Sequence, residues 1–169
     1  MAKQSYWPII GHQSITTLLD HLLANPYLHN HAFLFCGQRH LGKTLVAEEF
    51  IKRLLKLADE VSIWQQPDVH LLERLPDKTE IGIEQVRVWQ KDLILRPFAA
   101  PYKVGIIQEA EYLNQESSNA LLKILEEPSG QTLIIIIVND GQKILPTIRS
   151  RARQRKLLMV CWRLAVCLS

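Results

Sequence analysis

A chain of 169 residues is long enough to bury one hydrophobic core and short for two domains. Its hydrophobic content of 47% is ordinary for a globular protein, no apolar run approaches the roughly 20 residues of a membrane span, and the first residues lack a signal-peptide pattern. The net charge of +3 is uneven, because residues 149–169 hold six Lys or Arg and no acidic residue. This basic end either contacts nucleic acid or is a solvated surface.

The three cysteines, Cys36, Cys161 and Cys167, form neither a C-x-x-C pair nor a quartet. This spacing gives no support to a zinc site or to a disulfide framework. Cys36 ends an apolar run and is interpreted as a small core residue. A reduced, cytoplasmic setting is therefore expected.

Four short apolar runs alternate with helical patterns, which predicts an α/β fold with a parallel sheet. The last run is apolar throughout, as expected of a strand covered on both faces. The predicted strands are Ala32–Cys36, Val69–Leu72, Lys103–Ile107 and Leu133–Val138.

Two helices are predicted between these strands from the spacing of apolar residues. The first, Lys43–Leu57, places Val46, Phe50, Leu54 and Leu57 on one face. The second, Ile83–Ile94, does the same with Ile83, Val86, Gln90, Leu93 and Ile94.

A third helix is predicted around Leu121, Leu122 and Leu125. Asn114 is suited to cap its first turn, because an Asn side chain accepts hydrogen bonds from free backbone N–H groups. Pro128 ends it, because proline cannot continue a helix.

A phosphate-binding loop is predicted from G-Q-R-H-L-G-K-T at Gly37–Thr44, which follows a strand and opens a helix. Glycines such as Gly37 and Gly42 let backbone N–H groups converge on phosphate oxygens, and the helix N-terminus adds partial positive charge. Lys43 is expected to reach the β and γ phosphates, and Thr44 to hold Mg²⁺. The bulky His40 is expected to narrow the loop.

The second half of such a site is usually an apolar strand that ends in Asp-Glu, whose carboxylates hold the Mg²⁺ shell and orient the attacking water. Here the strand ends in Gln108 and Glu109. The neutral amide of Gln108 contributes no charge toward a hard cation, whereas Glu109 remains a candidate base. We therefore expect weakened ATP binding and poor hydrolysis.

Two polar residues follow the last predicted strand, Asn139 at its tip and Arg151 twelve residues later. Taken alone, Asn139 is a common turn residue and Arg151 a common surface charge. Together they favour Asn139 as a contact of the γ phosphate or the attacking water, and Arg151 as a guanidinium offered to a neighbouring molecule. A chain that binds nucleotide and presents an arginine outward suggests a ring whose ATP sites lie between subunits.

With these motifs in order, the chain resembles AAA+ clamp-loader subunits, in particular the delta-prime subunits of bacterial DNA polymerase III. The resemblance covers about Trp7 to Lys156. Its most specific segments are H-A-F-L-F-C-G-Q-R-H-L-G-K-T, I-G-I-E-Q-V-R and A-L-L-K-I-L-E-E-P. It implies a P-loop NTPase fold of three layers, a role in loading the sliding clamp on primed DNA, and other clamp-loader subunits as partners, with no membrane association.

The resemblance also assigns residues. Ile10 and Gly11 fall where the family's backbone contacts adenine, and Gly37, Gly42, Lys43 and Thr44 match the phosphate loop. Asn139 matches the sensor position. Ser150 and Arg151 match the Ser-Arg-Cys motif, whose arginine reaches the adjacent subunit's ATP site.

The chain departs from the family at several positions. Ala152 replaces the motif cysteine, Gln108 replaces Asp, and the cysteine quartet of a zinc module is absent. The helical lid and collar that the resemblance implies after such a domain are expected to be absent. We expect an AAA+ domain at residues 1–156 and a divergent, truncated or frameshifted tail at 157–169.

Three alternatives stay open at this point. An autonomous ATPase requires Glu109 to compensate for Gln108. A small-molecule phosphotransferase is disfavoured, because nothing resembles an acceptor-binding lid. A truncated fragment without function is the third.

Overall fold

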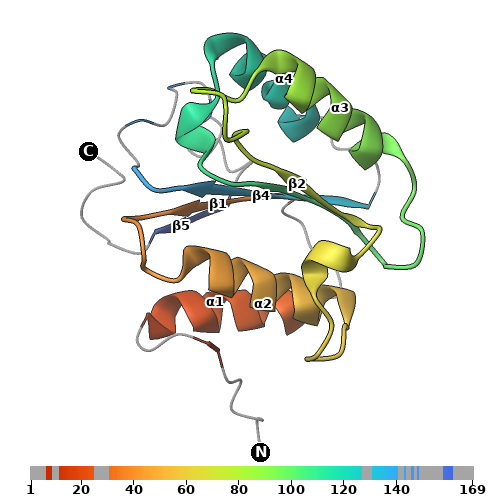
Figure 1. Ribbon diagram of the computed structural model, residues 1–169. Helices are drawn as coiled ribbons and strands as arrows, with labels where there is room; N and C mark the ends of the chain where they lie inside the picture. The colour runs from red at the N-terminus through yellow and green to blue at the C-terminus, as the bar shows by residue number, and fades with distance from the viewer. Residues whose placement is uncertain are drawn as a thin grey trace, which may run out of the picture.

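The computed structural model describes residues 7–8, 12–24, 31–126, 131–140, 143, 146 and 148, and the backbone of 158–161. These residues form three layers (Figure 1): a central sheet, two helices on one face and two on the other. The predicted three-layer α/β fold with a parallel sheet is confirmed.

The sheet has five parallel strands in the order β2-β3-β4-β1-β5. In β1, β3 and β4 every residue is buried, which explains why all of them are apolar or small except Lys103 and Thr132, the first residues of β3 and β4. The strands are β1 (Ala32–Cys36), β2 (Val69–Leu72), β3 (Lys103–Ile107), β4 (Thr132–Val138) and β5 (Leu158–Cys161).

The helices cover both faces of this sheet. α1 and α2 lie on one face, and α3 and α4 lie on the other (Figure 1). Their bounds are α1 Gln13–Ala24, α2 Lys43–Leu55, α3 Ile83–Ile94 and α4 Gln115–Glu126, with short 3₁₀ turns η1 at Ile63–Gln65 and η2 at Ala110–Tyr112.

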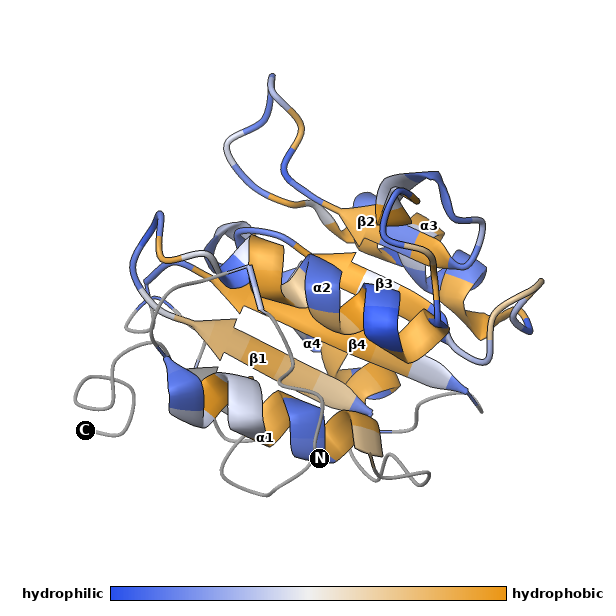
Figure 2. Ribbon diagram, turned by 90° about the horizontal axis from the view of Figure 1, so that it is seen from below, coloured by the Kyte–Doolittle hydropathy of each residue, from blue (hydrophilic) through white to orange (hydrophobic). Residues whose placement is uncertain are grey.

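The hydrophobic core is divided by the sheet into two halves. Alternate residues of β1 and β4 point to opposite faces, so that Phe33 and Phe35 join α1 and α2 while Leu34 and Cys36 join α3 and α4. The strands are accordingly hydrophobic along their length (Figure 2). Cys36 is a buried core residue, as predicted.

The predicted strands agree with the structure to within one residue. The single difference is that β4 begins at Thr132 and not at Leu133. Asn114 caps α4 as predicted, since its side-chain oxygen accepts a hydrogen bond from the Ser117 backbone N–H at 2.9 Å. Pro128, the predicted end of this helix, lies outside the described residues.

Two predictions about helices are wrong. α2 ends at Leu55, because Lys56 adopts the left-handed conformation with φ 56° and Leu57 bonds back to Lys52. Ile94 does not face the core: it is 63% exposed, and Trp89 takes its place among the buried residues of α3.

Two elements were not predicted. α1 places Ile15 and Leu19 in the core, and β5 pairs with β1 as the outer strand of the sheet. The sheet thus extends into residues that the sequence analysis assigned to the tail.

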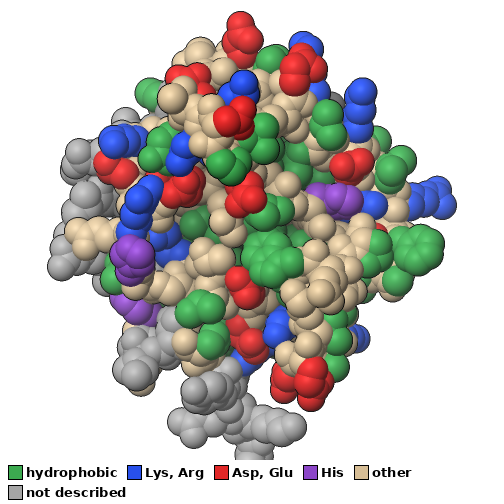
Figure 3. All heavy atoms as spheres, viewed as in Figure 1, with side chains coloured by type: hydrophobic (Ala, Val, Ile, Leu, Met, Phe, Trp, Pro, Cys, Tyr) green, Lys and Arg blue, Asp and Glu red, His purple; other side chains and the backbone are tan. Residues whose placement is uncertain are grey.

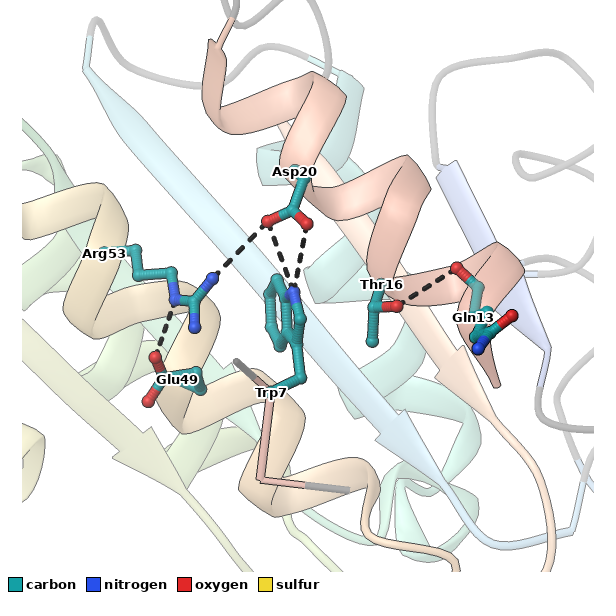
Figure 4. Close-up of polar contacts among 6 residues, drawn as sticks. All are labelled: Trp7, Gln13, Thr16, Asp20, Glu49 and Arg53. Carbon is teal, nitrogen blue, oxygen red and sulfur yellow. Dashed lines mark hydrogen bonds and ion pairs between the residues drawn. The ribbon is translucent and has the colours of Figure 1, made fainter. Parts of the chain in front are cut away.

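Trp7, near the start of the chain, contacts residues of both α1 and α2 (Figure 4). Its indole N–H donates to the Asp20 carboxylate at 3.2 Å, and the Arg53 guanidinium lies 4.4 Å from the centre of its ring. Arg53 is held in turn by Glu49 at 2.6 Å. Trp7 is buried, so this contact holds Trp7 itself against the two helices.

None of the described helices is long and apolar enough to cross a membrane.

Candidate nucleotide-binding site

The predicted phosphate loop joins β1 to α2, at the carboxyl end of the sheet. Gly37 follows β1 directly, and Gly42 precedes Lys43, the first residue of α2. Gly42 has φ 79°, a left-handed conformation that glycine adopts without steric cost. No side chain caps the start of α2, so its first backbone N–H groups remain open toward the loop.

His40 also adopts a left-handed conformation, with φ 62°. For a residue with a β-carbon this conformation is uncommon and strained. Its side chain is exposed and borders two adjoining hollows, of about 280 Å³ and 360 Å³. The narrowing of the loop by His40 stays a prediction.

Lys43 is almost fully buried, with 4% of its surface exposed. Its ammonium group donates a hydrogen bond of 2.6 Å to the backbone carbonyl of Gln38, within the same loop. Burial lowers the pKa of Lys43, and the nearby carboxylate of Glu111 opposes this shift. The cation that is predicted to meet the phosphates thus bonds to its own loop in this structure.

Gln108 and Glu109 follow β3 in sequence and border the smaller hollow together with Thr44 and Asn139. The Gln108 backbone N–H bonds to the Leu72 carbonyl at 2.9 Å, which continues the sheet by one residue. Glu109 adopts a left-handed conformation with φ 50° and starts the η2 turn.

The carboxylate of Glu109 accepts a hydrogen bond of 2.8 Å from the guanidinium of Arg39, a residue of the phosphate loop. Both side chains are partly exposed, so the pair contributes little to stability, about 1 kcal/mol or less. The pair does fix the direction of the Glu109 carboxylate, the candidate general base, toward Arg39. In this structure Glu109 serves as a partner of the loop.

Asn139 follows β4 and borders both hollows, beside Thr44 and His40. Its backbone N–H faces the Glu111 carboxylate at 3.3 Å. Glu111 thereby links the tip of β4 to the η2 turn. The structure brings the sensor candidate, the phosphate loop and the end of β3 to one place.

The structure tests none of the predicted roles of the site residues, and it does not describe four of these residues. Ile10, Gly11 and Arg151 lie outside the described residues, as does Ser150. Their assignments remain predictions.

Two residues of the site were missed by the sequence analysis. Arg39 lies inside the phosphate-loop motif at a position that tolerates any residue, so nothing in the motif marks it. Glu111 follows Glu109 by two residues, and its approach to Asn139 depends on the η2 turn, which the sequence pattern did not reveal.

A bound Mg²⁺ would find one predicted protein donor here, the hydroxyl of Thr44, which borders both hollows. Among the described residues no group of three or more His, Cys, Asp or Glu side chains is arranged to hold a metal. A hydroxyl with phosphate oxygens suits a hard cation that is held chiefly by its nucleotide. The residues therefore fit a nucleotide-borne Mg²⁺ better than an independent metal site.

Comparison with known proteins places these features in context. Residues 11–160 match the profile of the family described as DNA polymerase III, delta subunit. The chain is 32% identical over 140 residues to DNA polymerase III subunit delta' of Pseudomonas aeruginosa, covering 75% of this chain and 43% of that protein. It is 31% identical over 162 residues to subunit tau/gamma of Haemophilus influenzae, covering 89% and 23%. The chain thus spans less than half the length of these relatives.

Solved structures agree on the fold. A DNA polymerase III gamma subunit-related protein of Thermotoga maritima matches with a TM-score of 0.67 and 25% identity, over 88% of this chain and 45% of that one. The RuvB Holliday junction branch migration motor of the same organism matches with a TM-score of 0.60 and 16% identity, over 89% and 45%. The fold is that of AAA+ P-loop proteins.

Proposed function

Since this chain belongs to the family of DNA polymerase III delta subunits, we propose that it acts in DNA replication as a clamp-loader subunit of the delta-prime type. In this role it helps to load the sliding clamp on primed DNA, together with other clamp-loader subunits. The likeness to a delta' subunit and to tau/gamma subunits supports the assignment.

The site is proposed to bind ATP with Mg²⁺. Gly37, Gly42 and Lys43 hold the phosphates, Thr44 faces the cation, and Ile10 and Gly11 contact adenine. The observation that carries this proposal is the folded phosphate loop, in which the uncapped start of α2 lies beside two hollows bordered by Thr44 and Asn139. Backbone N–H groups at a helix start and a lysine ammonium are well suited to phosphate oxygens.

Hydrolysis by this chain is proposed to be slow. Gln108 supplies no carboxylate, and the Glu109 carboxylate is held by Arg39 at 2.8 Å. A general base needs its carboxylate within hydrogen-bond reach of the attacking water. The chain therefore binds nucleotide more readily than it turns nucleotide over, and Asn139 senses the γ phosphate.

Arg151 is proposed to serve the ATP site of a neighbouring subunit. An arginine that arrives from another chain stabilises the charge that develops during phosphoryl transfer. Its place twelve residues after Asn139 and the family likeness support this role.

The test of nucleotide binding is calorimetric titration of the chain with ATP. Lys43→Ala should lower the affinity at least tenfold, because it removes the one ammonium group of the loop. Lys91→Ala provides a matched control, since Lys91 is exposed on α3 and borders neither hollow. Equal affinity in parent and Lys43→Ala, or no binding by the parent at millimolar ATP, would contradict the proposal.

A further inference from the structure

The outer edge of β2 is open. β2 is the terminal strand of the sheet, and among the described strands only β3 pairs with it. The backbone carbonyls of Asp68 and Leu72 face β3, because they accept hydrogen bonds from Val104 and Gln108 at 2.8 Å and 2.9 Å. Strand groups alternate in direction, so the N–H and C=O of Leu71 face away from β3. An open strand edge is a site at which another extended chain can pair.

A groove of about 650 Å³ runs along this edge, between β2 and α3. One wall is formed by residues 69–73 and Leu75, and the other by one face of α3 that includes Val88 and Trp89. Leu71, Leu75 and Val88 are exposed. A groove with exposed apolar side chains beside an unpaired strand is the geometry in which peptide-binding domains accept an added strand.

The walls of the groove are acidic. They carry the carboxylates of Glu73, Glu84 and Asp92 and no Lys or Arg. The one other titratable group is His70, whose pKa is lowered by burial and by Lys103, against the opposing effect of Asp92. Glu84 is paired with Arg87 at 2.8 Å, which leaves Glu73 and Asp92 as the main negative charges. The face that contains β2 shows hydrophobic, acidic and basic side chains next to one another (Figure 3).

We propose that this groove binds an extended segment of a partner protein in which apolar residues alternate with Lys or Arg. The segment pairs with β2 through the outward backbone groups of Leu71. Its apolar side chains pack against Val88 of α3, and its cations meet Glu73. Alternation follows from strand geometry, because successive side chains point to opposite faces.

This surface is separate from the nucleotide site. None of its residues borders the hollows beside Thr44 and Asn139. The proposal therefore stands or falls independently of ATP binding.

A fluorescein-labelled peptide that alternates lysine and valine is the probe, and fluorescence anisotropy with the full chain is the measurement. Val88→Lys should weaken binding at least tenfold, because it replaces an apolar contact with a charge that repels the peptide. Ile94→Lys is the matched control: Ile94 lies on the same helix, is 63% exposed against 60% for Val88, and does not line the groove. It should leave binding unchanged.

A second variant tests strand pairing directly. Leu71→Pro removes the outward N–H, and a proline is tolerated on the free side of an edge strand. It should also weaken binding at least tenfold, and the amide of Leu71 in the parent should exchange with solvent more slowly when the peptide is present.

Three results would overturn the proposal. The first is the absence of saturable binding by the parent at millimolar peptide. The second is equal binding by the Val88→Lys and Ile94→Lys variants. The third is self-association of the chain that Val88→Lys abolishes, because that result would assign the groove to a second copy.

Discussion

At the scale of single residues, the parts of the site that the sequence predicted are those set by the backbone. Lys43 and Thr44 are placed by the turn from β1 into α2, and Asn139 by the end of β4. Arg39 and Glu111 escaped prediction, because their contacts join segments far apart in the chain: 70 residues separate Arg39 from Glu109, and 28 separate Glu111 from Asn139. Spacing within a motif carries no information about such contacts.

Gln108→Asp tests whether the neutral amide limits turnover. A carboxylate near a bound divalent cation contributes several kcal/mol, whereas an amide offers only a dipole. The substitution removes one methylene, so the structural cost should be small. We expect Mg²⁺-dependent ATP hydrolysis to rise when partner subunits are present, measured by Mg²⁺ titration of parent and variant. A parent that already turns ATP over at an ordinary AAA+ rate would show that Gln108 is no obstacle.

Gly105 of β3 has no side chain, and this lets Trp89 and Leu93 of α3 pack closely against the sheet. A β-carbon at this position in β3 would overlap the ring of Trp89 and lie 2.7 Å from Leu93. Gly105→Ala should therefore lower the free energy of unfolding by about 1–3 kcal/mol, because overpacking forces the core to shift. Urea denaturation is the measurement. Gly82→Ala is the control, since nothing lies within 4 Å of a β-carbon added there. Because Gly82 is the N-cap of α3, where glycine is preferred over alanine, the substitution should cost no more than about 1 kcal/mol.

At the scale of elements, three of the four predicted strands match the structure at both ends. Continuous apolar runs specify buried strands well, because both faces of the sheet are covered. β5 was missed because its run L-M-V-C continues into further apolar residues, so that no turn residue marks its ends. α1 was missed although Ile15, Leu19 and Leu22 recur at helical spacing.

Asp68 connects the start of β2 to the loop before β3. This buried carboxylate accepts backbone hydrogen bonds from Phe98, Ala99 and Ala100 at 2.6–2.9 Å, and Lys103 lies 3.7 Å away. Burial raises its pKa, but these hydrogen bonds and the lysine outweigh that effect and the pKa is lowered. The charged form is therefore favoured in the folded state.

Asp68→Asn should lower the free energy of unfolding at pH 7 by about 1.5–3 kcal/mol, because it removes a charged acceptor from buried donors. A lowered folded-state pKa contributes stability above the unfolded value of about 4, and this contribution is lost as the pH falls through the folded value. The difference between parent and variant should therefore shrink in acid. Urea denaturation from pH 7 to pH 2.5 is the measurement, with the exposed Asp77→Asn as control. A difference that stays constant with pH would refute the assignment.

At the scale of the whole molecule, the proposed function divides the site residues between two chains. The phosphate loop, Asn139 and Glu109 converge on one side, whereas Arg151 is proposed to act on another chain. Neither the partner nor its position can be derived from one sequence, because the contacts of an oligomer depend on a second surface.

Arg151→Ala should slow ATP hydrolysis by the neighbouring subunit by roughly 10³-fold or more, the usual contribution of an arginine supplied in trans. The measurement is the steady-state ATPase rate of partner subunits reconstituted with the parent or the variant chain. Arg149→Ala is a control with the same loss of charge two residues away, and it should change the rate little. An unchanged rate in a complex shown to be assembled would exclude the proposed role.

The bond between Lys43 and the Gln38 carbonyl has a thermodynamic consequence for ligand entry. Because the ammonium already has an acceptor and the loop is already folded, nucleotide binding is an exchange of partners and requires little new ordering. The measured affinity would then reflect how much more strongly the Lys43 ammonium bonds to a phosphate oxygen than to the Gln38 carbonyl. We expect such a site to load and release nucleotide readily.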